Sequence, residues 1–296
     1  MKFSIFIPTK NAGPRFAETL TAIFAQEEKS FEVIAVDSGS TDGTLDVIRG
    51  FPVRLYQIPP SEFGHGRTRN LAGKYAAGDY VVFMSQDAMP ASPQWLSSFI
   101  ARWDDRVAGA YSRQLPRPDA SAGERFFCGT HYPPVATRRP RRRPAKRPEE
   151  FFFSDVSSCL RRDLLMQYPL DDSIIMSEDH EWAKRIIAAG YATLYEPESA
   201  VIHSHSYSAL ETFKRYFDTA YVLKLINGRY MHFLTGKGLL YMARELVYVT
   251  ANHPRELPAT IAADAAKSAG TFLGLYARFL PHRLNRRLSM HSYYWK

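Results

Sequence analysis

The sequence predicts an α/β protein built on a doubly wound, mostly parallel sheet. Over the first hundred residues, short apolar runs alternate with segments of helical pattern. The apolar runs are nearly continuous, as expected when helices cover both faces of a parallel sheet. Strand–helix alternation of this kind is typical of doubly wound domains.

The predicted elements alternate from the first residues onward. The expected strands are 3–8, 31–37, 53–58 and 79–84, and the expected helices are 14–26, 44–49, 67–77 and 93–103. In such sheets, ligands bind at the carboxyl ends of the strands. The residues directly after each strand are therefore the first candidates for a functional site.

The pattern changes after the first hundred residues. Residues 113–155 show little periodicity, whereas 178–189 are expected to form a helix that Gly190 ends. A short strand is expected within 193–203. From residue 210 to the end of the sequence, the pattern is helical and aromatic.

Composition excludes several classes of protein. The 296 residues are 45% hydrophobic and 23% charged, which argues against a disordered tail or a collagen. Cys128 and Cys159 are too few for a disulfide framework and lack metal-ligand spacing. The N-terminal apolar stretch is too short for a signal peptide, and no window holds about 18 consecutive apolar residues. We expect a soluble, basic, cytoplasmic protein.

The net charge of +8 is concentrated in two places. A proline-broken loop carries Arg138, Arg139, Arg141, Arg142, Arg143, Lys146 and Arg147. The last residues interleave Arg278, Arg283, Arg286, Arg287 and Lys296 with Phe279, Leu280, Leu284, Leu288, Tyr293, Tyr294 and Trp295. Such a mixture suits an anionic membrane surface, with a solvated tail as the alternative. We expect no nucleic-acid partner, because the sequence has no recognisable nucleic-acid-binding motif.

We expect the chain to divide in two. The first domain covers 1–208 and contains a flexible basic loop at about 133–149. The second part, 209–296, is a helical, basic and aromatic C-terminal region.

Polar segments follow the first two predicted strands. Pro8, Thr9 and Asn11 follow the first strand, in a stretch without the G-x-G-x-x-G or Walker patterns. Asp37 and Ser38 follow the second strand. They either start a turn and a helix, or present a carboxylate to a ligand hydroxyl or base.

The next two strands also end at polar residues. Arg67 and Arg69 follow a Gly-x-Gly at a helix start, which suits a phosphate site or an ordinary loop with surface arginines. Gln86 and Asp87 follow the fourth strand. A carboxylate at this position is a candidate ligand for a divalent metal, with a turn cap as the alternative.

Two later clusters carry titratable groups. Glu178 and Asp179 open a helix, where the helix dipole alone favours acidic residues. His203 and His205 follow a strand and would share one face of it. The residues alone do not separate a structural histidine pair from a ligand pair.

The order of these motifs resembles that of family 2 inverting glycosyltransferases with the GT-A fold. The match is closest to the bacterial rhamnosyltransferase branch and spans about residues 3–220. The segments that carry it are Pro8-Thr9-x-Asn11, Asp37 to Thr44, Phe63 to Asn70, Gln86-Asp87-Ala88, Phe152 to Ser158, Glu178 to Arg185 and His203-Ser204-His205. Ser85 and Gln86 depart from the family pattern, because they leave Asp87 as a single carboxylate.

The resemblance implies a role for each candidate residue. Residues 1–208 would be the catalytic GT-A domain. Its nucleotide-sugar site would comprise Pro8, Thr9, Asn11, Asp37, Ser38, Arg67, Arg69, Gln86 and Asp87. Asp87, His203 and His205 would hold Mg²⁺ or Mn²⁺. Asp179 would be the general base, with Glu178 as the alternative or as an orienting residue.

The resemblance also implies substrates and a location. The favoured donor is dTDP-rhamnose, and the acceptor is a cell-surface glycan such as O-antigen, on a polyprenyl diphosphate carrier. The enzyme would then lie peripherally on the inner face of the bacterial inner membrane. The alternatives are a UDP- or GDP-hexose donor on the same fold, a nucleotidyltransferase, and a non-catalytic membrane- or nucleic-acid-binding protein.

Overall fold

A computed structural model describes residues 2–139, 148–227 and 236–295. The chain divides into two compact units. The first comprises 1–115, 132–173 and 178–203, and the second comprises 116–131, 174–177 and 204–296. Residues 140–147 of the expected basic loop lie outside the described residues.

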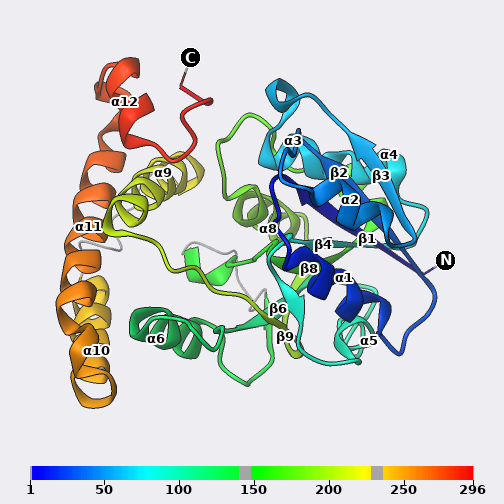
Figure 1. The fold of residues 1–296 in the computed structure, drawn as a ribbon, viewed down its shortest axis with the longest axis horizontal. Helices are drawn as coiled ribbons and strands as arrows, with labels where there is room; N and C mark the ends of the chain where they lie inside the picture. Colours follow the sequence, from blue (N-terminus) through cyan, green and yellow to red (C-terminus); the bar gives the residue numbers. More distant parts are fainter. Residues whose placement is uncertain (1, 140–147, 228–235, 296) are drawn as a thin grey trace. The chain divides into compact units, whose positions relative to one another are not determined.

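The first unit is built on a nine-stranded sheet in order β3-β2-β1-β4-β8-β6-β9-β5, with β7 paired to β9 (Figure 1). Its strands are β1 (Phe3–Thr9), β2 (Phe31–Asp37), β3 (Val53–Gln57), β4 (Tyr80–Met84), β5 (Met89–Pro90), β6 (Val107–Leu115), β7 (Thr137–Arg139), β8 (Ser157–Arg161) and β9 (Ala192–Ile202). The strands β3, β2, β1 and β4 are mutually parallel. β8 is antiparallel to both of its neighbours, and β6 and β9 are parallel.

The helices of this unit are short. They are α1 (Phe16–Phe24), α2 (Thr44–Arg49), α3 (His65–Asn70), α4 (Ala72–Tyr75), α5 (Trp95–Ser98), α7 (Arg162–Gln167) and α8 (Glu178–Ala188). One core cluster joins apolar residues of β1, β2 and β4 to the buried face of α1. This packing confirms the predicted α/β fold, and the first four predicted strands are present. Gly190, with φ +94°, directly follows the helical turn at the end of α8.

Some element predictions are wrong. The expected single helix over 67–77 is two helices, α3 and α4, joined at Leu71. The middle segment 113–155 contains a regular helix, α6 (Ala122–His131), and the end of β6. β9 has eleven residues, so the strand expected within 193–203 is not short. β6 and β9 form by pairing with each other, although they are far apart in the sequence, and local periodicity does not reveal such pairing.

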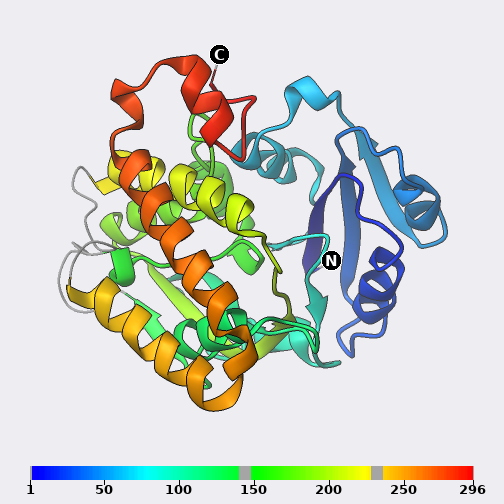
Figure 2. The same ribbon diagram turned by 60° about the vertical axis from the view of Figure 1, so that its left-hand side comes forward.

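The second unit is helical, as expected. It contains α6 together with α9 (Ala209–Asn227), α10 (Gly236–Asn252), α11 (Leu257–Leu275) and α12 (His282–Leu288). Figure 2 shows α11, in orange, running beside α9. A Cβ atom at Gly270 would lie 2.3 Å from Phe213 O, and one at Gly274 would lie 2.2 Å from Phe217 O. Glycine is therefore required where the two helix backbones approach each other.

The end of the chain folds back onto this unit. Trp295 packs against Phe217 and Ala277 in a small core, although the sequence suggested an exposed aromatic tail. The buried carboxylate of Asp218 accepts hydrogen bonds from the backbone of Met290 (2.9 Å) and His291 (3.2 Å). In the described part of the chain, no helix has both the length and the apolar character needed to cross a membrane.

Candidate active site

The ends of β1 and β2 form one side of the site. Asp37 is fully buried, and its Oδ1 accepts hydrogen bonds from the amides of Gly39 and Ser40, both at 2.9 Å. Its Oδ2 accepts from the hydroxyls of Thr9 (3.1 Å) and Ser40. Asp37 therefore organises the turn after β2 and holds it against the end of β1.

The neighbouring candidates extend this connection. Asn11, at φ +47°, accepts from the amide of Thr41 through Oδ1 (2.9 Å). Ser38 donates from its amide and its hydroxyl to Thr9 O, at 3.0 and 3.2 Å. Pro8 lies one residue before Thr9 and is in register with Val36. The structure thus brings Pro8, Thr9, Asn11, Asp37 and Ser38 together at the carboxyl edge of the sheet.

Gln86 joins the loop after β4 to the same edge of the sheet through two hydrogen bonds. Its Oε1 accepts from the amide of Lys10 (2.8 Å), and its Nε2 donates to Lys10 O (3.0 Å). This pair of hydrogen bonds places the segment that carries Asp87 beside the segment after β1. Three strand ends predicted to carry functional residues therefore meet.

A buried charge cluster surrounds Arg69. Its Nη1 donates to Glu178 Oε1 (2.9 Å), and its Nε lies 3.6 Å from Asp155 Oδ2. The guanidinium carbon lies 6.0 Å from the centre of the Phe83 ring. Arg69, Asp155 and Glu178 are all less than 10% exposed, whereas Arg67 on the same helix is exposed. The two arginines therefore occupy different environments, although both were predicted to bind the nucleotide sugar.

Asp179 is the second residue of α8, and both of its carboxylate oxygens accept hydrogen bonds. Oδ2 accepts from the amide of Asp155 (3.0 Å). Oδ1 accepts from the amide of His180 (2.8 Å) and contacts His180 Nδ1 at 3.0 Å. Burial opposes ionisation, but the His180 charge and these hydrogen bonds outweigh it and hold the pKa of Asp179 below its ordinary value. Asp179 is therefore a carboxylate at neutral pH, in a fixed orientation.

Asp155 was not singled out as a functional residue by the sequence. Burial raises the pKa of Asp155 to about 7, despite Arg69 and with the help of the Asp179 and Glu178 charges. Burial also raises the pKa of Glu178. Two carboxylates, those of Asp155 and Glu178, thus lie against the guanidinium of Arg69, and Asp155 gains a proton as the pH falls toward neutrality.

The raised pKa of Asp155 predicts a pH-dependent contribution to stability. Between its unfolded pKa of about 3.9 and its folded value, the native state binds more protons than the unfolded state, so stability falls as pH rises. We therefore expect Asp155→Asn to gain stability relative to the wild type as pH rises from about 4 to about 7. Urea unfolding at several pH values measures this difference.

Asp163→Asn is the matched control for this prediction. Asp163 lies beside Arg161, whose hydrogen bond lowers the pKa of the Asp163 carboxyl. The variant should therefore show no relative gain in stability over this pH window. If the free energy of unfolding of Asp155→Asn changed with pH in parallel with that of the wild type, the raised pKa of Asp155 would be contradicted.

Asp87 and His203 provide a pair of candidate metal ligands. Asp87 Oδ1 lies 3.6 Å from His203 Nε2. Metal–ligand distances of about 2.0–2.2 Å place neighbouring ligand atoms roughly 3 Å apart, so the pair fits a divalent cation with little movement. His205 follows two residues after His203, at the start of the second unit, where its ring stacks on Tyr207 at 4.8 Å.

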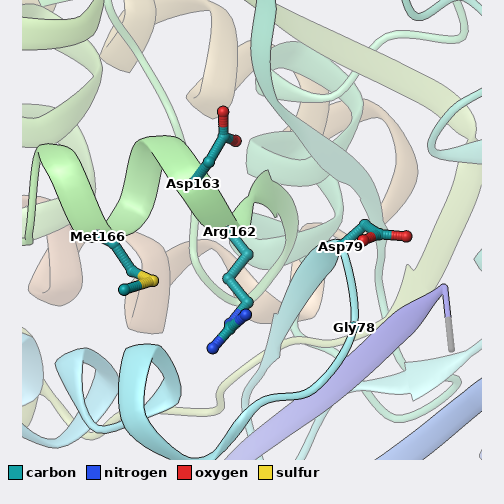
Figure 3. Close-up of a pocket in the computed structure, with 5 residues that line it drawn as sticks. All are labelled: Gly78, Asp79, Arg162, Asp163 and Met166. Carbon is teal, nitrogen blue, oxygen red and sulfur yellow. The ribbon is translucent and has the colours of Figure 1, made fainter.

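A separate hollow of about 260 Å³ lies elsewhere in the first unit. Figure 3 shows its lining residues, which are Gly78, Asp79, Arg162, Asp163 and Met166. It adjoins the segment before β4, at the amino end of that strand, whereas Asp87 follows the carboxyl end. Because ligands of such sheets bind at the carboxyl ends, we do not assign the substrate to this hollow.

The fold is that of a GT-A glycosyltransferase. The chain belongs to glycosyl transferase family 2, whose family model matches residues 4–168. The predicted family is thus confirmed, and the chain is a glycosyltransferase rather than a non-catalytic binding protein.

Two full-length relatives are O-antigen chain rhamnosyltransferases. WbaN of Salmonella anatum is 32% identical over 99% of this chain and 95% of its own length. RfbN of Salmonella typhimurium is 30% identical over 100% of this chain and 96% of its own length. The predicted closeness to rhamnosyltransferases is therefore confirmed.

Solved structures support the fold. The mannosyltransferase PcManGT from Pyrobaculum calidifontis, in complex with GDP-Man and Mn²⁺, matches with a TM-score of 0.58 and 19% identity, over 99% of this chain and 84% of that one. Residues 1–349 of TarS from S. aureus match with a TM-score of 0.54 and 16% identity, over 95% and 92% of the two chains.

Proposed function

We propose that this glycosyltransferase moves L-rhamnose from dTDP-rhamnose, with inversion, to a hydroxyl of a cell-surface glycan or a lipid-linked saccharide. The observation that carries the donor assignment is the 32% identity to an O-antigen rhamnosyltransferase over 99% of the chain. The arrangement of carboxylates at the sheet edge supports the reaction type. A UDP- or GDP-hexose donor is the alternative on the same site.

Asp179 is the proposed general base. Inverting transfer is one displacement at the anomeric carbon, in which the acceptor oxygen forms its bond to the sugar and the nucleoside diphosphate leaves. The acceptor hydroxyl must lose its proton to a carboxylate within about 2.6–3.2 Å. Asp179 suits this step because its lowered pKa keeps it ionised and its hydrogen bonds fix its orientation.

Glu178 is the proposed orienting residue rather than the base. Its Oε1 is 2.9 Å from Arg69 Nη1, and its side chain is buried. Adjacent helix residues point about 100° apart, so Glu178 and Asp179 do not reach the same atom. Arg69 then acts through the carboxylates that it neutralises, and the exposed Arg67 is the better candidate for contact with the donor diphosphate.

Asp87, His203 and His205 are the proposed ligands of Mg²⁺ or Mn²⁺. The 3.6 Å separation of Asp87 Oδ1 and His203 Nε2 supports the first two. His205, two residues after His203, is included on the family resemblance. When bound, the ion would stabilise the negative charge that develops on the departing diphosphate.

The nucleotide would lie against the end of the sheet near Asp37. Pro8, Thr9, Asn11 and Ser38 surround this carboxylate or continue its hydrogen-bonded turn. We propose that this preformed turn recognises the base, and that Gln86 keeps the segment carrying Asp87 beside it. Donor selectivity would then depend on these residues.

A lipid-linked acceptor would bring the enzyme to the inner face of the membrane. One relative, 27% identical over 68% of this chain, is the N-acetylglucosaminyl-diphospho-decaprenol L-rhamnosyltransferase of Mycobacterium tuberculosis. In the second unit, Phe279 is 65% exposed and Leu284 is 40% exposed. Exposed arginines accompany them at Arg278, Arg283, Arg286 and Arg287. This combination supports peripheral contact with anionic lipid.

A thermal-shift panel tests the donor. A ligand that binds only the folded state raises the melting temperature. At a ligand concentration of 100 times its Kd, the free energy of unfolding rises by about 2.7 kcal/mol. We expect dTDP-rhamnose with Mn²⁺ to give a larger shift than UDP- or GDP-sugars, and the dTDP-rhamnose shift to shrink without Mn²⁺. A larger shift with a UDP- or GDP-hexose would overturn the donor assignment.

A further inference from the structure

A buried glutamine side chain lies behind His203. Gln114 is the penultimate residue of β6, and His203 directly follows β9, which pairs with β6 in parallel. Because Leu115 is opposite Ile202 and accepts the His203 amide at 2.9 Å, the sheet register carries the histidine to this place. Gln114 Oε1 lies 2.9 Å from His203 Nδ1, and both residues are buried.

The Gln114 amide also contacts two hydroxyl groups. Its Nε2 donates to Tyr132 OH at 2.6 Å and to Ser154 Oγ at 3.0 Å. With both amide hydrogens directed at these oxygens, Oε1 faces the imidazole. An oxygen acceptor at that position requires a proton on His203 Nδ1, which leaves the lone pair on Nε2.

A rotated amide would require the opposite tautomer. Gln114 Nε2 would then donate to His203 Nδ1, and His203 Nε2 would carry the hydrogen toward Asp87. The 3.6 Å between His203 Nε2 and Asp87 Oδ1 is longer than a hydrogen bond, so this arrangement gains no bond there. The same separation suits two ligand atoms of one cation.

We propose that Gln114 is a positioning residue that fixes the His203 tautomer, with the Nδ1 proton on the glutamine side and the Nε2 lone pair toward Asp87. The inference rests on the proposed function, because Asp87 and His203 are its proposed metal ligands. Hydrogen-bond partners behind a ligating histidine typically change metal affinity 10- to 100-fold when they are removed. The effect on metal affinity should be larger here, because Asp87 is the sole carboxylate of its Ser85-Gln86-Asp87 segment and His203 supplies a greater share of the binding.

Two substitutions of similar volume separate this role from simple packing. Gln114→Met fills the space but offers no carbonyl acceptor to the imidazole. Gln114→Glu retains the acceptor, and the hydroxyls of Tyr132 and Ser154 can rotate to donate to it. The glutamate variant is therefore the matched control, and it should keep the tautomer that the methionine variant loses.

Two measurements on the full chain test the proposal. The first is ¹⁵N NMR of the histidine ring nitrogens of the metal-free protein, with His203 assigned by His203→Gln. The wild type and Gln114→Glu should show the proton on Nδ1, and Gln114→Met should lose that preference. The second is Mn²⁺ binding followed by electron paramagnetic resonance. We expect the Kd to rise 10- to 100-fold in Gln114→Met and only a few-fold at most in Gln114→Glu.

The outcomes distinguish the role of Gln114 from the proposed metal site. A wild-type His203 with its proton on Nε2, or a Gln114→Met protein that keeps both the tautomer and the Mn²⁺ affinity of the wild type, overturns the proposal. If the tautomer depends on Gln114 but the wild type binds no Mn²⁺, the role of Gln114 is supported and the proposed metal site is wrong.

Discussion

Asp179→Asn should lower the rate of sugar transfer by about 10²- to 10⁴-fold, the usual contribution of a positioned general base. The substitution preserves the shape of the side chain but removes its ability to take a proton from the acceptor hydroxyl. Donor affinity should stay near that of the wild type, because Asp179 lies among Asp155, Glu178 and His180 rather than at the turn of Asp37. Initial rates and isothermal titration with dTDP measure the two quantities.

Glu178→Gln is the matched variant for the base assignment. It changes the neighbouring carboxylate, whose partner in the structure is Arg69. If Asp179 is the base, Glu178→Gln should lose much less activity than Asp179→Asn. Weakened donor binding with transfer intact in Asp179→Asn would contradict its role, and so would a greater loss of activity in Glu178→Gln.

Arg69→Met should destabilise the protein by about 3–5 kcal/mol, the usual cost of removing one partner of a buried ion pair. The Arg69 side chain is 10% exposed, and its partners Asp155 and Glu178 are 3% and 6% exposed. Without the guanidinium, both carboxylates would remain buried without a compensating charge. Urea unfolding measures the loss, which should shrink at low pH as these carboxylates take up protons.

Arg67→Met provides the control on the same helix. Arg67 is exposed, so its replacement should change the free energy of unfolding by no more than about 0.5 kcal/mol. Its proposed contact with the donor diphosphate predicts weaker dTDP binding instead. If the two variants were equally stable, the cluster around Arg69 would not have the structural role assigned to it.

The sequence was most informative where the structure is local. The strands β1, β2 and β4 are nearly continuous apolar runs, and the boundaries of β1 to β4 agree with prediction to within one residue. β8 and β9 were less visible, because their hydrogen bonds join segments far apart in the chain. The helix α6 mixes apolar with polar residues and has two buried side chains, Ala122 and Cys128, so its periodicity is weak.

The candidate site shows the same division. The polar residues after β1, β2 and β4 were predicted, since the topology of parallel sheets gathers such residues at one edge. Their hydrogen-bond partners were not predicted. Asp155, Gln114 and His180 are ordinary polar residues in the sequence, and only their burial or their contacts with Arg69, His203 and Asp179 single them out. The segments around Asp155 and His180 did carry the family resemblance, whereas Gln114 lay outside every segment that carried it.

The proposed reaction is the transfer of rhamnose, with inversion, from dTDP-rhamnose. The most direct measurement is NMR spectroscopy of the product formed from dTDP-rhamnose and diphosphate-linked saccharide acceptors with a hydrophobic tail. We predict a rhamnosyl product whose anomeric configuration is opposite to that of the donor. A product that retains the donor configuration, or transfer from a UDP- or GDP-hexose but not from dTDP-rhamnose, would contradict the proposed reaction.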